Sequence, residues 1–98
     1  MSTELASIPY AIRNSYGDAA LPFLEAGVKD SGYVWVRTNC ARELIIAGRP
    51  SGFAFIVDAI QGNRPYKREM IQFVQDRFPQ LKSADETAVL AFVKERAM

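Results

Sequence analysis

The chain has one cysteine and no histidine, which limits the chemistry that its side chains can perform. A thiol nucleophile needs a neighbouring base to form the reactive thiolate, and histidine is the usual base. Histidine is also a common zinc ligand, and one thiol cannot build a zinc site by itself. Cys40 stands among small apolar residues at helical spacing, so we predict a packing role for it. We expect no catalytic residue, no metal and no cofactor, and we expect that the protein is not an enzyme.

The sequence has one cluster of basic side chains, formed by Arg64, Lys67 and Arg68. Basic groups at the start of a helix can hold phosphates, and Arg42 would add a further charge, so nucleic-acid binding is one hypothesis. The plainer interpretation is a solvated face in which Glu69 and Asp76 pair with these cations. The net charge of +1 gives the chain no general attraction to nucleic acid or to an anionic membrane. We expect no membrane binding, and we rank nucleic acid below a protein partner.

Six side chains are candidates for contacts with a protein partner. Four of them lie at predicted turns and are aromatic or basic, as hot-spot residues often are: Tyr33, Trp35, Tyr66 and Lys67. Two acidic residues, Glu25 and Asp58, recur 33 positions apart and would offer a charged surface to a basic partner. Each candidate also has a plainer interpretation, because Trp35 can pack against an adjacent hairpin and acidic side chains are commonly only solvated.

The elements that position these residues are predicted to be helices. Apolar residues recur every three or four positions through nearly the whole chain, and strand-like alternation is scarce. The predicted fold class is therefore all-α, with six short helices at about 5–16, 18–29, 36–47, 51–61, 65–78 and 83–93. Gly48 followed by Pro50 is the usual punctuation at the end of one helix and the start of the next.

The apolar positions of three helices predict which faces are buried. In the first helix they are Leu5, Ile8, Ile12 and Tyr16. In the third they are Val36, Cys40, Ala41 and Leu44, opposite a polar face of Thr38, Asn39, Arg42 and Glu43. In the fifth they are Tyr66, Met70, Phe73, Val74 and Phe78.

Three local signals predict how helices begin. Pro9 is tolerable only near the beginning of the first helix, because proline has no N–H to donate. Asp18 is expected to cap the second helix. Ser83 and Glu86 match a capping box, in which their side chains accept hydrogen bonds from backbone N–H groups at the start of the last helix.

The middle of the chain resembles a unit of the HEAT-like repeat family, in the short form of bacterial HEAT-repeat proteins and phycobilin-lyase-type repeats. The likeness rests on Asp30, on Val36-Arg37, Ala41, Leu44 and Gly48, and on Pro50 before the apolar run 53–60. It departs from the family in a longer turn and in Cys40, where Ala is common. A shift of 33 residues aligns Tyr33 with Tyr66, a period in the solenoid range. The flanking units match more weakly, with Arg68 the nearest counterpart of Arg37.

The resemblance implies an α-solenoid of about three stacked hairpins, with units near 3–30, 31–63 and 64–98 in a single domain, 1–98. Cys40 and Ala41 would let two helices approach closely, and Asp30 would cap the incoming helix or hold Arg37. The implied function is a non-enzymatic protein-interaction or scaffolding module that uses the concave face of the second, fourth and sixth helices. The alternatives are a nucleic-acid-binding HEAT-like module and an accessory subunit of lyase-like type for a chromophore.

Location and assembly follow from what the sequence lacks. One cysteine excludes an internal disulfide, as is usual in the cytosol, and no apolar run approaches the ~18 residues of a membrane span. The first residues also lack the basic and apolar regions of a signal peptide. We expect a cytoplasmic protein. An exposed apolar face on a terminal hairpin would favour a homo-oligomer.

Overall fold

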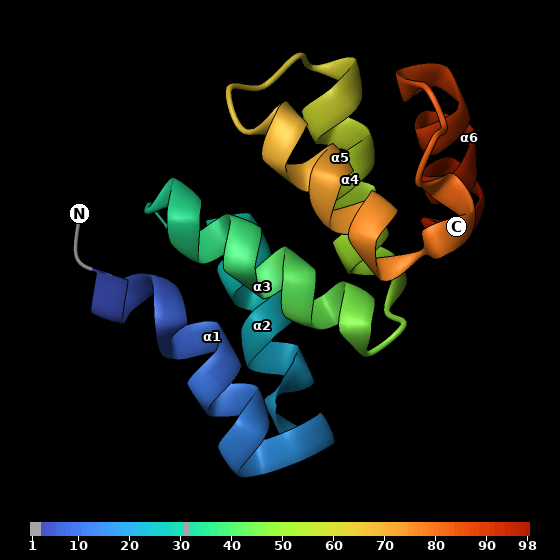
Figure 1. Cartoon of the computed structure of the whole chain (residues 1–98). Coiled ribbons are helices and arrows are strands. Elements are labelled where there is room, and N and C mark those ends of the chain that lie inside the picture. The colour runs from blue at the N-terminus through green and yellow to red at the C-terminus, as the bar shows by residue number, and fades with distance from the viewer. Residues whose placement is uncertain (1–2, 31) are drawn as a thin grey trace. The chain divides into compact units, whose positions relative to one another are not determined.

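The computed structural model describes the backbone of residues 3–30 and 32–98 and the side chains of residues 9–29 and 32–98 (Figure 1). All regular structure within these residues is helical, which confirms the all-α prediction. The α-helices are α1 (Thr3–Tyr16), α2 (Leu21–Asp30), α3 (Val34–Ile46), α4 (Pro50–Gln61), α5 (Lys67–Arg77) and α6 (Glu86–Arg96). Two short 3-10 helices, η1 (Gly17–Ala20) and η2 (Pro79–Leu81), lie before α2 and after α5.

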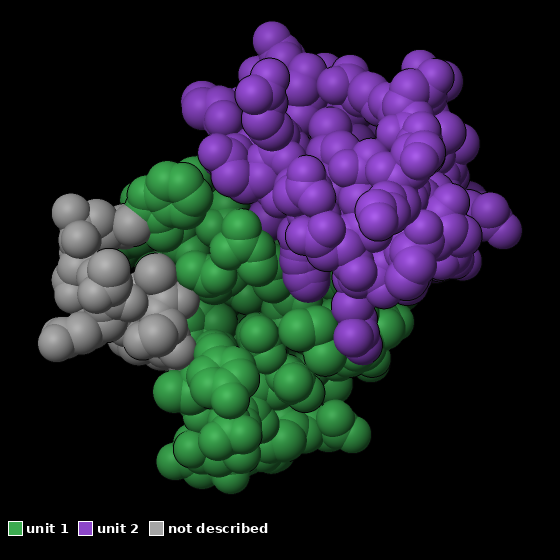
Figure 2. Space-filling view, viewed as in Figure 1, with its two compact units in different colours: residues 1–52 green, residues 53–98 purple. Residues whose placement is uncertain are grey.

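The chain divides into two compact units, coloured green and purple in Figure 2. Unit 1 is Met1–Gly52 and unit 2 is Phe53–Met98, so the division falls within α4, after its first turn. The repeat boundaries expected near residues 30 and 63 stay a prediction.

Unit 1 is built around α3, on which both α1 and α2 pack. Glycine permits close approach at two places. A Cβ at Gly27 on α2 would lie 2.7 Å from the Cys40 Sγ on α3, and a Cβ at Gly52 would lie 2.8 Å from the Ile45 N and 2.9 Å from the Ala41 O. These distances are too short for an added Cβ. At Gly52 the nearest atoms are backbone, so α3 and α4 meet almost backbone to backbone there, whereas at Gly27 the nearest atom is a side-chain sulfur. The expectation that Cys40 and Ala41 allow close packing is confirmed.

The buried residues of unit 1 are mostly small or aliphatic, and two of them contradict the expected polar face of α3. The apolar set is Ala20, Leu24, Val28, Cys40, Ala41, Leu44 and Ile45. Thr38 is 0 % exposed and Glu43 is 8 % exposed. Thr38 Oγ1 donates to the Trp35 carbonyl, and Glu43 accepts from Arg13 of α1. These residues are buried because neighbours cover α3 on more than one side, so only partnered polar groups fit there.

Unit 2 has aromatic rings in contact inside it. Phe78 contacts Phe53 and Phe92, with ring centroids 6.1 and 4.9 Å away, and the Arg96 guanidinium lies 3.5 Å from the Phe92 centroid. These contacts join α4 to α5, and the end of α5 to α6. The buried apolar residues are Phe53, Ile56, Ala59, Ile60, Tyr66, Met70, Val74, Leu81, Val89 and Val93.

The turn at Gly48 has the predicted form. Gly48 has a φ of +75°, which glycine adopts without strain, its N–H donates to the Ile45 carbonyl, and the Arg49 N–H donates to the Leu44 carbonyl. Pro50 is the first residue of α4, where its missing N–H costs nothing.

Three predictions of helix beginnings are wrong. Pro9 is the seventh residue of α1, not near its start. Asp18 lies inside η1, which makes the reversal before α2, so it is not the cap of that helix. The N-cap of α6 is Asp85, which accepts from the Ala88 N–H at 2.8 Å, because the helix begins two residues later than a cap at Ser83 requires.

Candidate functional site

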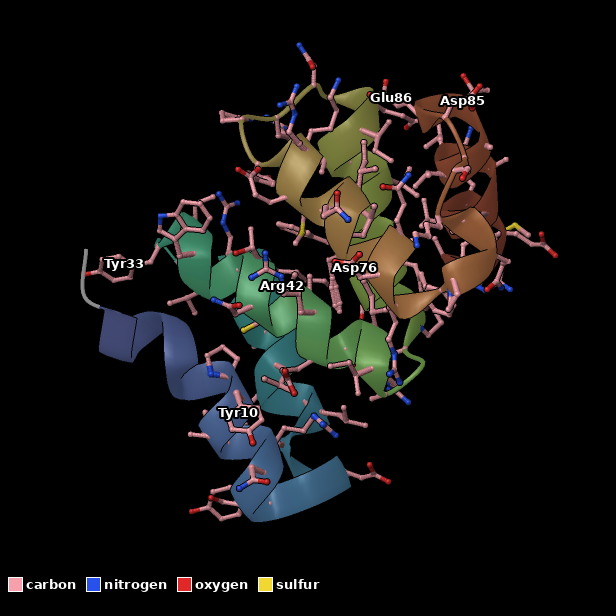
Figure 3. All side chains as sticks on the ribbon, in the orientation of Figure 1. Tyr10, Tyr33, Arg42, Asp76, Asp85 and Glu86 are labelled. Atoms are coloured by element: carbon pink, nitrogen blue, oxygen red, sulfur yellow. The ribbon has the colours of Figure 1, made fainter. Side chains whose placement is uncertain are left out.

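The two aromatic candidates near the start of α3 are exposed. Tyr33 is 55 % exposed and Trp35 is 40 % exposed. Tyr33 precedes the helix in an extended conformation, its carbonyl accepts from the Val36 N–H at 3.0 Å, and Figure 3 shows its side chain at that end of α3. The Trp35 carbonyl accepts from two side chains of the next turn, so its backbone is fixed while a large part of its indole faces solvent.

The two acidic candidates are each paired with an arginine of their own unit. Glu25 on α2 accepts from Arg49 at 2.9 Å in unit 1. Asp58 on α4 accepts from Arg64 at 3.2 and 3.3 Å in unit 2. A basic partner would have to displace these arginines, and a role for the carboxylates in partner binding stays a prediction.

The basic cluster is tied into unit 2 by ion pairs. The hydrogen bond and the charge of Asp58 raise the pKa of Arg64. Lys67 lies 3.0 Å from Glu86 at the start of α6. The expected pairing with Glu69 and Asp76 is wrong, because in the part of the chain that the structure describes Arg64 pairs with Asp58 of α4 and Lys67 pairs with Glu86 of α6. Asp76 accepts instead from Gln72.

Tyr66 is buried, in contrast to the other aromatic candidates. It is 8 % exposed, and its ring stacks on Phe55 with centroids 5.3 Å apart and an angle of 13°. Packing accounts for this residue, and a role in partner binding stays a prediction. The expected pairing of Asp30 with Arg37 cannot be followed, because the Asp30 side chain lies outside the described residues. Arg37 Nε is buried with no hydrogen-bond partner among those that are described.

Cys40 has the packing role that the sequence predicts. It is 3 % exposed, and its sulfur lies against Gly27. Burial, and secondarily the charge of Glu43, raise the pKa of the Cys40 thiol to about 11. The thiol is therefore protonated at neutral pH, which suits a small apolar core residue.

A groove that the sequence did not predict lies in unit 1, where α1 turns back into α2. Its volume is about 340 Å³, and its lining is almost wholly apolar: Ile12, Tyr16, Ala19 and Phe23. Tyr16 is 69 % exposed and Phe23 is 71 % exposed, so the expectation that Tyr16 lies on a buried face is wrong. One signal could have indicated the groove, since Phe23 lies outside the apolar stripe formed by Leu21, Leu24 and Val28.

The exposed aromatic residues are unevenly distributed between the units. Among the side chains that the structure describes, the exposed large apolar ones are Tyr10, Tyr16, Phe23, Tyr33, Trp35 and Met98. The five aromatic members all lie in unit 1, and only Met98 lies in unit 2. Isolated exposed apolar residues are common on proteins, but a concentration beside a groove is a feature of interaction surfaces.

The described residues contain neither a cluster of metal ligands nor a helix that could span a membrane. No three His, Cys, Asp or Glu side chains among them lie close enough together to hold a metal ion. None of the described helices has the length and hydropathy needed to cross a bilayer. Comparison of the whole chain with protein-family models gives no match, and neither do comparisons with curated proteins and with solved structures.

Proposed function

We propose that this protein is a non-enzymatic protein-binding module, arranged as a HEAT-like α-solenoid. The observation that carries the proposal is the set of exposed aromatic side chains on unit 1, two of which, Tyr16 and Phe23, line the apolar groove. The residues that carry the HEAT-like resemblance support the arrangement, since α3 ends at Ile46, Gly48 makes the turn, and the apolar α4 begins at Pro50.

The cost of exposed aromatic surface is the physical argument. A ring held in water forgoes the free energy of burial, about 25 cal/mol for each Å² of apolar area. Unit 2 buries or stacks its rings, which shows that this composition permits burial. Tyr and Trp are also enriched among residues that dominate binding energy. A partner that covers the rings of unit 1 would recover the forgone free energy.

Nucleic-acid binding through Arg64, Lys67, Arg68 and Arg42 ranks lower. Arg64 and Lys67 already have carboxylate neighbours, so a phosphate would have to compete with Asp58 and Glu86. A lyase-like accessory role has no observation in its favour.

The proposal is tested by capture from a lysate of the organism that encodes the chain, before and after treatment of the lysate with nuclease. The immobilised wild type is compared with Trp35→Ala and Phe23→Ser, and Arg68→Ala is the matched control on an exposed basic residue of unit 2. We expect the captured amount of at least one protein to fall about tenfold with an aromatic variant and to be unchanged with the control.

Circular dichroism must show unchanged helicity for each variant. Capture that depends on Arg68 and disappears after nuclease treatment would overturn the proposal in favour of nucleic acid. The proposal would also be overturned if none of the captured proteins depended on an exposed aromatic residue.

A further inference from the structure

The groove of unit 1 has two walls. Ile12 and Tyr16 are four residues apart on α1, and therefore on one face of that helix. Ala19 and Phe23 form the other wall, on η1 and the first turn of α2. Gly17, with a φ of +59°, reverses the chain between the walls. A groove lined by two consecutive helical segments can receive the apolar face of a third helix.

The size of the groove suits a short segment. Its volume of about 340 Å³ is at the low end of the range for ligand pockets. Two aromatic side chains of roughly 200 Å² each, more than two thirds exposed, offer on the order of 300 Å² of ring surface. A stable interface between folded proteins buries about 800 Å² on each partner. The groove therefore cannot by itself hold a stable dimer, but it can hold a few apolar side chains.

The charge beside the groove is acidic. Asp18 is the only acidic or basic residue between positions 14 and 24, and it lies in η1 between Tyr16 and Ala19. The charges nearby are paired with one another, Arg13 with Glu43 and Glu25 with Arg49. No cation among the described residues pairs with Asp18. A ligand with a positive charge near its apolar residues would complement this site.

The binding mode follows from the secondary structure. Peptides commonly bind by adding a strand to a sheet edge, by laying a helix in a groove, or as an extended polyproline helix. The described residues contain no strand and so offer no sheet edge. Walls whose members are one helical turn apart match anchors spaced one turn apart on a partner helix.

We infer that the groove of Ile12, Tyr16, Ala19 and Phe23 binds an amphipathic helical segment of a partner protein, with large apolar residues one turn apart and a Lys or Arg that reaches Asp18. This inference rests on the proposed protein-binding function and names the partner segment. The apolar anchors supply most of the affinity, and the ion pair sets which end of the segment lies near the turn.

The test uses a fluorescein-labelled helical peptide of about 16 residues, with leucines at i, i+4 and i+7, a lysine one turn beyond, and alanines elsewhere. Fluorescence anisotropy measures its Kd for the whole chain, and two-dimensional NMR of labelled protein locates the site. We expect saturable binding, with amide shifts concentrated in residues 12–24.

Three variants separate the contributions. Phe23→Ser should raise the Kd about tenfold, and Asp18→Asn should raise it about threefold and flatten its salt dependence. Tyr10→Ser is the matched control, because Tyr10 is 59 % exposed on α1 but lies two residues, about 200°, from Ile12 (Figure 3). It should leave the Kd unchanged. A peptide with Glu in place of Lys should bind the wild type more weakly.

Several results would overturn the inference. These are no binding near 1 mM peptide, shifts that lie outside 12–24, and tighter binding of a proline-rich extended peptide. A dimer seen by sedimentation and abolished by Phe23→Ser would assign the groove to a second copy instead. If the wild type still captures proteins that Trp35→Ala loses, these results contradict the groove inference but leave the proposed protein-binding function intact. Failure of the inference can therefore be distinguished from failure of the proposed function.

Discussion

In unit 1 the aromatic rings lie outside a core of small and aliphatic residues, whereas in unit 2 the rings contact one another inside. Both units are built from short helices, and their net charges differ by only one unit. The difference lies in how closely the helices approach. At Gly27 and Gly52 an added Cβ would be within 2.9 Å of a neighbouring atom, while in unit 2 the half-buried Phe78 contacts the buried Phe53 and the half-buried Phe92.

The spacing between packed helices decides whether an aromatic ring can lie between them. Helices in near-backbone contact leave no volume for an aromatic side chain, so rings on those helices point outward and remain available to a partner. Helices held apart by rings bury them and present little apolar surface. Two units of one chain can therefore place their rings differently without a large difference in hydrophobic content.

The largest effect is expected when the same substitution is made in each unit. Phe78→Ala removes a ring with two aromatic neighbours and should lower the free energy of unfolding by about 3 kcal/mol. Phe23→Ala removes an exposed ring and should change it by less than about 0.5 kcal/mol. Urea denaturation followed by circular dichroism measures both. Equal losses would contradict the contrast between the units.

Gly52→Ala should break the close approach in unit 1. The new methyl group would lie 2.8 to 2.9 Å from two backbone atoms, which cannot move independently, so we expect a loss of about 2–3 kcal/mol. Gly32→Ala is the control, since nothing lies within 4 Å of a Cβ there. Trp35, the only tryptophan, makes fluorescence a probe of unit 1. If Gly52→Ala left the free energy of unfolding unchanged, the helices would have room to separate.

Alkaline pH should weaken unit 1 through Cys40. The pKa of its thiol is about 11 when folded, against 9.0 for an unperturbed thiol, so the contribution to stability is complete below pH 9 and is lost as pH rises toward 11. The loss should reach about 2 kcal/mol at pH 11. Comparing wild type with Cys40→Ala between pH 8 and 11 isolates this contribution, because other groups titrate in both. If the free energies of unfolding of the two proteins fell in parallel with pH, the assignment of this effect to Cys40 would be contradicted.

The smallest effect concerns the contact between Gly27 and Cys40. Gly27→Ala should cost about 1 kcal/mol, because the methyl group meets Sγ at 2.7 Å while the helix gains from alanine. In the Cys40→Ala background the contact is absent, so the same change should be neutral or stabilising. A double-mutant cycle by thermal denaturation measures the coupling. An equal cost in both backgrounds would place the clash elsewhere.

Local features were the ones that the sequence predicted well. The helical class, the Gly48-Pro50 punctuation and the buried stripe of Cys40, Ala41 and Leu44 depend on neighbours within a few residues. The packing role of Cys40 was also predictable, because small apolar residues at helical spacing suffice to indicate it.

Features that depend on a second helix were missed. Glu43 was assigned to a polar face, but Arg13, 30 residues away, makes its burial tolerable. The neighbours of Arg64 and Lys67 were sought among close acidic residues, yet the structure supplies them from α4 and α6. The groove was missed because a stripe of apolar residues does not indicate whether another element covers it, and Tyr16 is left exposed.

The contact between Gly27 and the Cys40 sulfur also constrains how such a chain can change over generations. A lineage that acquires a larger residue at position 27 loses less stability when the side chain at position 40 is also shortened, so the two sites should tend to mutate as a pair. At position 52 no second substitution can compensate in this way, because the neighbouring atoms include backbone atoms that a substitution cannot remove. Among descendants, glycine should therefore persist at 52 while 27 and 40 drift together.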